Sequence, residues 1–310
     1  MDTTGTPDMQ YTVVNLSNNN SNKLDSSKTY DLTSYSCQNG TTLSFDKTTR
    51  RITSNGIDKC TLNFTESEGD LLYDVVEIGD YISYTGNNGC TENQCIGWNE
   101  NQTDTDVYEN YGYCSSEIRK FYTYGWRTLY KNDNSVYIVS AGAPECVIET
   151  ELDSESTKTS LNDAALKYCN TSYISGGDCD AETALVHAFN GDDFYKFTSQ
   201  HYGSNNARYL YNYNDGGTYG SPYCANEYPQ KYCGYNNDII DNGGAYWFAS
   251  GHSSRGPIAW DAEERVIISS GPTVNTYGLR PVIKLDSTIK VTGGLGTMKN
   301  PYEISKRNGA

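Results

Sequence analysis

Alternating apolar and polar residues appear in short runs near the start of the chain, and this period of two predicts β-strands. The runs are TLSF at 42–45, RIT at 51–53 and CTLNF at 60–64. Asn-Gly pairs at 39–40 and 55–56 are typical of the tight turns that join neighbouring strands. The pattern therefore predicts a small β module.

The module has a polar, flexible start and an acidic boundary at its end. Residues 15–29 read NLSNNNSNKLDSSKT, a low-complexity run that is typical of a flexible segment. The acidic run at 66–70 is the expected domain boundary. We predict a β module over residues 1–68 and a larger domain over residues 69–310.

Strand patterns resume in the larger domain. They occupy residues 81–84, 124–130 and 136–140, and the segment Asn-Asp-Asn at 132–134 fits a tight turn between the last two. We therefore expect a β-hairpin here.

Helical spacing follows the hairpin. Over residues 160–168, the side chains of Leu161, Ala165 and Tyr168 fall on one face of a helix. Ser160 is the expected N-cap, because its hydroxyl can accept a hydrogen bond from a backbone N–H of the first turn. This segment predicts the first helix of the domain.

Two further helices and a last set of strands complete the domain. The helices are predicted at 181–188 and 192–199, and His187 on the first of them is interpreted as a packing residue. A long loop rich in Tyr, Asn and Gly spans 201–243, and strands return over 246–302. Strands, helices, a loop and more strands in this order predict an α+β fold and disfavour a parallel nucleotide-binding sheet.

One insert breaks the regular patterning. Residues 250–276 mix polar, charged, aromatic and turn residues without a period, although the segments on both sides, 245–249 and 277–285, read as strands. Side chains that face outward and serve recognition need no such period, so we interpret the insert as a ligand surface. The core residues expected in the flanking strands are Tyr246, Trp247, Phe248, Leu279, Val282 and Leu285.

The apolar content is low, so the fold needs support besides apolar burial. Hydrophobic residues make up 36% of the chain, against roughly 45–50% in a typical soluble domain. The ten cysteines are typical of disulfides in an exported protein, and free thiols in a cytosolic protein are the alternative. Ten cysteines allow very many pairings. Pairing of sequence neighbours is the simplest hypothesis: Cys37–Cys60, Cys90–Cys95, Cys114–Cys146, Cys169–Cys179 and Cys224–Cys233.

The charge of the chain excludes some classes of partner. The formal net charge is −16, and no cluster of Lys and Arg is present to neutralise phosphates, which argues against nucleic acid. An anionic membrane surface is disfavoured for the same reason, and no apolar run reaches the roughly 20 residues of a membrane helix. The first ten residues, MDTTGTPDMQ, are not a signal peptide. We expect an extracellular or cell-surface protein whose leader or anchor is absent from this sequence.

Several segments together resemble a known family. They are Asp80-Tyr81, Gly125-Trp126, LNDAA at 161–165, DNGG at 241–244 leading into YWFAS at 246–250, GLRPVIKL at 278–285 and VTGGLGTMKNPYEI at 291–304. The chain resembles, over about residues 70–304, the C-type-lectin-fold surface proteins of gut bacteria, some of which are the variable proteins of diversity-generating retroelements. The resemblance implies a C-type lectin-like fold whose last strands and loops display a ligand-binding surface. The partner would be an unknown protein or glycan.

The resemblance also implies which residues vary. In such systems, error-prone copying at template adenines mainly rewrites Asn codons, which reach many residue types but not Trp or Glu. The candidate variable, ligand-binding residues are Gly251, His252, Ser253, Arg255, Pro257, Ile258, Asp261, Ala262, Ile268, Pro272, Thr273 and Asn275. The expected scaffold residues are Trp247, Trp260, Leu279, Arg280 and Pro281. Glu263 and Glu264 would come from other codons or be fixed.

Three alternatives remain open at this point. The first is a surface loop that drifts freely on a lectin or adhesin of fixed specificity. The second is an enzyme of the formylglycine-generating type, but the Gly-Asn-Val-Trp-Glu-Trp segment of that family is missing, and we expect no catalytic residues. The third is a calcium site formed by the oxygen-rich residues 236–238, Asp241 and Asn242. The Glu-Pro-Asn and Trp-Asn-Asp motifs of calcium-dependent lectins are missing, so we expect neither a metal nor a cofactor.

Overall fold

The computed structural model of the 310-residue chain describes most of both predicted domains. The described residues are 10–12, 29–46, 51–56, 58–67, 69–90, 95–96, 125–149, 154–180, 183, 185–202, 239–240, 246–252, 256–261, 266–269 and 275–309. They form several sheets and few helices, so the α+β class and the disulfide-stapled character expected from the sequence are both present.

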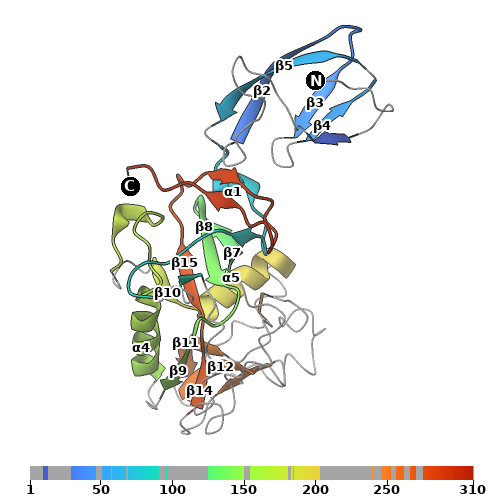
Figure 1. Ribbon diagram of the computed structural model, residues 1–310. Coiled ribbons are helices and arrows are strands. Elements are labelled where there is room, and N and C mark those ends of the chain that lie inside the picture. The colour runs from blue at the N-terminus through green and yellow to red at the C-terminus, as the bar shows by residue number, and fades with distance from the viewer. Residues whose placement is uncertain are drawn as a thin grey trace.

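The first five strands form a β module of their own (Figure 1). One sheet has the order β1-β4-β3, from Gln10–Thr12, Arg51–Ser54 and Leu43–Asp46. The other pairs β2, Thr29–Cys37, with β5, Cys60–Ser67. The three predicted strands correspond to β3, β4 and β5, whereas β1 and β2 lack a clear alternation and were not predicted as separate strands.

A small core and one disulfide hold this module together. Ile52 and Leu62 are buried, and the rings of Phe45 and Phe64 meet edge to face with centroids 4.9 Å apart. Cys37 lies opposite Cys60 at the end of the β2–β5 pair, and the two form the disulfide that was predicted. The bridge therefore closes a sheet that has few apolar contacts of its own.

The junction to the second domain coincides with the acidic boundary segment. Strand β5 ends at Ser67 and the short helix α1, Leu72–Val75, begins five residues later. Gly69 between them has a φ of +82°, and a Cβ atom at this position would lie 2.1 Å from the carbonyl oxygen of Val291. Val291 is the first residue of β16, Val291–Gly293, which pairs with β17, Glu303–Ile304. The close approach of these two backbones leaves no room for a side chain at residue 69.

The second domain contains two five-stranded sheets. The first has the order β10-β15-β8-β7-β6, and the second has the order β13-β12-β11-β14-β9. The strands of the first sheet are β6 Tyr81–Ile82, β7 Trp126–Asn132, β8 Ser135–Ser140, β10 Val186–Ala188 and β15 Pro281–Lys284. Those of the second are β9 Glu145–Glu149, β11 Tyr246–His252, β12 Gly256–Asp261, β13 Val266–Ser269 and β14 Asn275–Leu279.

The predicted hairpin of the first sheet is confirmed. Asn132 of β7 pairs with Ser135 of β8, which leaves Asp133 and Asn134 as a two-residue turn. Both have positive φ angles, 49° and 59°, as the turn types that match the twist of a hairpin require. Asp and Asn tolerate this conformation better than most residues do, so the local sequence selects the turn.

Two of the helix predictions need correction, and one is confirmed. Helix α4 spans Ser154–Leu166, so Ser160 lies inside the helix and is not its N-cap. Residues 186–188 are strand β10 and not the end of a helix, because Val186 and Ala188 are buried and pair with Ile283 and Pro281 of β15. His187 is consequently on a strand. The third predicted helix is present as α5, Gly191–Tyr202.

The core of the second domain lies on both faces of β11. Tyr246 and Phe248 belong to a cluster that includes Phe194 and Phe197 of α5, whereas Trp247 packs in a second cluster. This second cluster includes Leu161 and Ala165 of α4. Figure 1 accordingly shows α4 and α5 on different sides of β11. The six core residues expected in the flanking strands, Tyr246, Trp247, Phe248, Leu279, Val282 and Leu285, are all buried.

Candidate ligand-binding face

Several of the predicted variable residues come together at one end of the second sheet. Gly251 and His252 end β11, and they lie opposite Pro257 and Gly256 at the start of β12. The next residue of β12, Ile258, pairs with Ser269 at the end of β13, one residue from Ile268. Five predicted residues from three neighbouring strands, Gly251, His252, Pro257, Ile258 and Ile268, therefore share this end of the sheet. We call this group the β11–β13 end.

Two other predicted residues lie at the opposite end. Asp261 ends β12, four residues beyond Pro257, which corresponds to about 13 Å along a strand. Asn275 begins β14, three residues before Gly278, and Gly278 pairs with Tyr246 at the start of β11. The strand geometry separates Asn275 from Gly251 by about 25 Å. The segment 251–276 is therefore divided between two ends of the sheet.

The remaining predictions for this surface fall outside the described residues. They are the variable candidates Ser253, Arg255, Ala262, Pro272 and Thr273, the calcium candidates 236–238, Asp241 and Asn242, and the disulfides Cys114–Cys146 and Cys224–Cys233. The predicted bridges Cys90–Cys95 and Cys169–Cys179 are present.

The scaffold residues predicted beside this face are buried. Trp247, Trp260, Leu279, Arg280 and Pro281 all lie inside the domain. The rings of Trp247 and Tyr277 meet edge to face with centroids 4.5 Å apart. Aromatic contacts of this kind, on both faces of β11, give the sheet a core that does not depend on the side chains at its ends.

Arg280 ties the second sheet to the first. Its Nε and Nη2 donate hydrogen bonds to the carbonyl oxygen of Ser140 at 3.2 and 2.9 Å. Its guanidinium lies over the ring of Tyr246, 4.7 Å from the centroid. The side chain is completely buried, so these contacts replace the water that a charged group would otherwise bind. The arginine of the GLRPVIKL segment thus has a structural role between β8, β11 and the β14–β15 junction.

A break in the pairing of β11 lies immediately before the candidate residues. The register of β11 with β12 shifts between Phe248 and Gly251. Here the backbone N–H of Ala249 donates to the carbonyl oxygen of Phe189 at 2.8 Å, and the hydroxyl of Ser250 accepts from the N–H of Gly191 at 2.9 Å. Both partners lie at the junction between β10 and α5, which therefore supports β11 where its pairing with β12 is interrupted.

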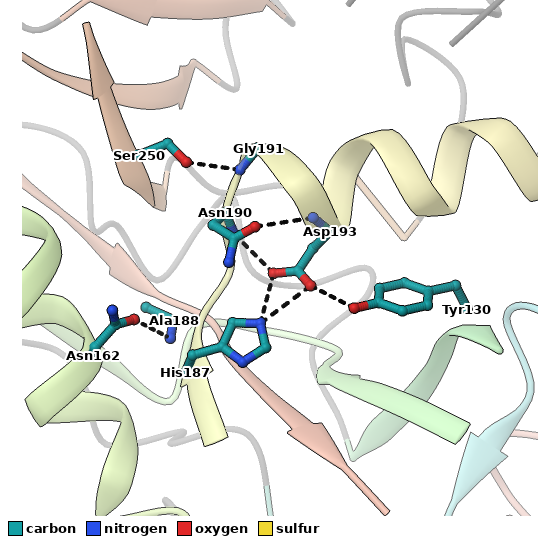
Figure 2. A network of polar contacts seen from close by, with 8 residues as sticks. All are labelled: Tyr130, Asn162, His187, Ala188, Asn190, Gly191, Asp193 and Ser250. Atoms are coloured by element: carbon teal, nitrogen blue, oxygen red, sulfur yellow. Dashed lines mark hydrogen bonds and ion pairs between the residues drawn. The ribbon is translucent and has the colours of Figure 1, made fainter. Parts of the chain in front are cut away.

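A buried carboxylate fixes this junction (Figure 2). Asn190 is the N-cap of α5: its Oδ1 accepts from the N–H of Asp193, and Oδ2 of Asp193 accepts from the N–H of Asn190, both at 3.0 Å. This reciprocal pair is a capping box. Oδ1 of Asp193 also accepts the hydroxyl of Tyr130 at 2.8 Å, and Nε2 of His187 lies 2.9 and 3.1 Å from the two carboxylate oxygens. Donors from β7, β10 and the cap thus surround one carboxylate.

The environment of this network favours a structural role. Asp193 is almost completely buried, and burial together with the adjacent Asp193 charge raises the pKa of Tyr130 far above its usual range. The phenol therefore stays protonated and remains a donor. An ionised carboxylate accepts hydrogen bonds only, so the contact makes Nε2 of His187 a donor as well. Sequence reasoning missed Ser250, Asp193 and Tyr130, although the Asn-x-x-Asp spacing at 190–193 is a signal for the capping box.

A recess lies in the β module. A groove of about 590 Å³ is lined by residues of β2 and β3: Asp31, Leu32, Thr33, Ser34, Tyr35, Leu43 and Phe45. In the same module, Cys37, Cys60 and Asp58 place one possible metal-ligand atom each within 4.8 Å of the others. The two cysteines form a disulfide, however, and their sulfur atoms are not available as metal ligands.

Asp58 instead stabilises the turn next to the disulfide. Its carboxylate accepts hydrogen bonds from the backbone N–H groups of Asn39 at 2.7 Å and Lys59 at 2.6 Å. Burial alone would raise the pKa of Asp58, but these backbone donors and Thr41 outweigh it, and the pKa lies below its ordinary value. The charged form of Asp58 is therefore the one that the folded module prefers.

Comparison of the chain with known protein families, curated proteins and solved structures finds no match. Among the described residues, none of the helices combines the length and the apolar character needed to cross a membrane.

Proposed function

We propose that this protein is an exported surface binding protein with a C-type lectin-like second domain, whose ligand surface is diversified by a retroelement. The proposal rests on one observation above all. Five candidate variable residues from three neighbouring strands lie together at the β11–β13 end. The core beneath them is built from residues outside the variable set, such as Trp247 and Trp260. Side chains at such a surface can change while the backbone keeps its course.

The disulfides support an extracellular or cell-surface location. Three of the predicted bridges are present, and such bridges persist in oxidising compartments. They also restrict the unfolded chain, so that the folded state tolerates exchange of surface residues. The first domain would then be the spacer or attachment module, and the second domain would be the recognition module.

The mechanism would be non-covalent recognition of a protein or a glycan. The proposal includes no catalytic step and no cofactor, and the His187, Asp193 and Tyr130 side chains contact one another at the cap of α5. Of the two ends of the sheet, we assign the principal ligand contact to the β11–β13 end. The larger number of candidate residues lies there.

The first experiment is to sequence the DNA on both sides of the gene and align it with codons 245–285. We expect a near-repeat that differs from the gene only at adenines, next to a gene for a reverse transcriptase. The codons of Gly251, His252 and Ile258 should differ between the two copies, and that of Trp260 should not. A flanking region without any such repeat would exclude diversification and leave a lectin or adhesin of fixed specificity.

A second experiment separates the two ends of the sheet. His252→Ala with Pro257→Ala alters the β11–β13 end, and Asp261→Ala with Asn275→Ala alters the other end. Wild-type protein and both variants are applied to a glycan array with and without calcium. The first variant should lose the binding of the wild type and the second should retain it, with melting temperatures nearly unchanged. The opposite result would move the ligand contact to Asp261 and Asn275.

A further inference from the structure

The backbone of β11 leaves its regular ladder just before the ligand-binding residues. Tyr246, Trp247 and Phe248 pair in sequence with Trp260, Ala259 and Ile258, but Gly251 pairs with Pro257 after the register shift. Ala249 and Ser250 are the two residues inside the irregularity. A strand that loses its ladder is bent locally, and the direction in which it continues is set by whatever binds the bulged residues.

Two hydrogen bonds from outside the sheet bind these residues. The N–H of Ala249 donates to the carbonyl oxygen of Phe189, and Ser250 Oγ accepts from the N–H of Gly191, at 2.8 and 2.9 Å. Only the second bond depends on a side chain of β11. A Cβ at position 191 would lie 3.4 Å from Ser250 Oγ, which shows how closely the start of α5 approaches this side chain.

The donor of the second hydrogen bond, the N–H of Gly191, is held in place by other elements of the domain. Gly191 is the first residue of α5, between the N-cap Asn190 and the buried Asp193, whose carboxylate is bound from β7 by Tyr130 and from β10 by His187 (Figure 2). The preceding strand is fixed as well, because the N–H of Ala188 donates to Oδ1 of Asn162 on α4 at 3.0 Å. The N–H of Gly191 is therefore a donor whose position is set by three other elements.

We propose that Ser250 is a positioning residue for the ligand face: its hydroxyl links β11 to the start of α5 and so fixes the course of Gly251 and His252. The inference rests on the proposed function, because it explains how a binding surface at the β11–β13 end keeps its shape while its side chains vary. Ser250 itself lies outside the candidate variable set. Without this hydroxyl, Gly191 loses its acceptor, and of the two hydrogen bonds that the described residues make to the bulge, the one at Ala249 remains.

The test compares Ser250→Ala with Ser250→Thr in the ligand-free protein by NMR. In Ser250→Ala, we expect the amide of Gly191 to exchange about tenfold faster, as expected for the loss of one hydrogen bond. The backbone order parameters of Gly251 and His252 should fall from about 0.85 to below about 0.6. Ser250→Thr keeps a hydroxyl and should restore both values.

Controls distinguish positioning from general destabilisation. The amides of Trp247 and Ala259, which pair on the regular side of the irregularity, should be unchanged, and so should the melting temperature within about 4 °C. Ser36→Ala, an exposed serine on β2, should alter none of these values. Unchanged order parameters at Gly251 and His252 in Ser250→Ala would overturn the proposal, and so would a loss of order throughout the sheet. No ligand enters the measurement, so its outcome is independent of the search for a flanking repeat.

Discussion

Trp260 stacks on Tyr246, its partner in the antiparallel register of β12 and β11, with ring centroids 6.4 Å apart and planes inclined by 23°. Both side chains are completely buried. Trp260 therefore belongs to the core, although it lies in the middle of the segment 251–276. The candidate residues Ile258 and Asp261 lie on either side of it in β12, Ile258 at the β11–β13 end and Asp261 at the opposite end.

This burial predicts a large effect of Trp260→Ala on stability. Removal of the indole leaves a cavity against Tyr246, and the free energy of unfolding should fall by about 3–5 kcal/mol in urea denaturation. Trp260→Phe is the matched control. Nε1 of Trp260 has no hydrogen-bond partner among the described residues, so a ring without this nitrogen should cost much less. Equal losses in the two variants would contradict the prediction that a packed aromatic ring at this position stabilises the fold.

The hydrogen bonds to Asp193 predict that the effect of Tyr130→Phe on stability depends on whether Asp193 is present. Asp193→Ala leaves the Asn190 N–H, the Tyr130 hydroxyl and His187 Nε2 without their acceptor, which should cost about 2–5 kcal/mol. Asp192→Ala, the exposed neighbour in the same helical turn, is the control and should cost well under half as much.

Tyr130→Phe completes the cycle. In the wild type it removes a donor to a charged group and should destabilise the protein by about 1.5–3 kcal/mol. In the Asp193→Ala background it removes an unsatisfied hydroxyl, so its cost should shrink or change sign. Urea denaturation of the four proteins measures the coupling. Additive effects would contradict the contact between these two side chains.

The lowered pKa of Asp58 predicts acid sensitivity of the β module. A carboxyl group whose pKa is lower in the folded state contributes stability above its unfolded pKa, about 3.9. It loses that contribution as the pH falls through the folded pKa. Asp58→Asn should therefore be less stable than the wild type at pH 6, and the difference should vanish towards pH 2. Thermal unfolding across this pH range measures it, with the exposed Asp163→Asn on α4 as the control. A difference that stays constant with pH would show that the charge of Asp58 has no part in it.

The number of residues that each disulfide encloses predicts which of two bridges stabilises the folded protein more. Cys37 and Cys60 are 23 residues apart, whereas Cys90 and Cys95 are 5 apart. Restriction of the unfolded chain gives about 3 kcal/mol for the first bridge and about 2 kcal/mol for the second. Calorimetry of the two double Cys→Ser variants should therefore find the larger loss when Cys37 and Cys60 are replaced. The reverse order would indicate that contacts around Cys90 and Cys95 depend on their bridge.

Local signals were sufficient for several elements. The alternation at 42–45, 51–53 and 60–64 predicted three strands of the first module, and the Asp133-Asn134 turn predicted a hairpin whose φ angles require such residues. Helix α5 was predicted at 192–199, and its apolar residues Phe194 and Phe197 are both buried on the side that meets β11. In these cases one face meets the core and the other meets water, so the pattern is visible in the sequence.

Other elements had no such pattern. Strands β12 and β13 lie inside the segment 250–276, whose residues show no repeating pattern, and β12 has adjacent buried residues, Ala259 and Trp260, that pack in different clusters. A strand buried on both faces does not alternate, so its period is lost. Residues 186–188 follow a helix-forming sequence but become β10, because β15 offers them a partner strand and the core accepts Val186 and Ala188.

By itself, the sequence determined the class of the fold and the strands and helices that have one solvent-exposed face. It also indicated three of the disulfide pairs and the buried aromatic residues around Trp247. Each of these depends on residue type and on spacing along the chain. Only the tertiary structure decided that Asp193 gathers Tyr130, His187 and Asn190, that Ser250 meets Gly191, and that the candidate ligand residues divide between two ends of one sheet. These relationships join residues that are up to 63 positions apart, and their geometry depends on how whole strands pair and pack.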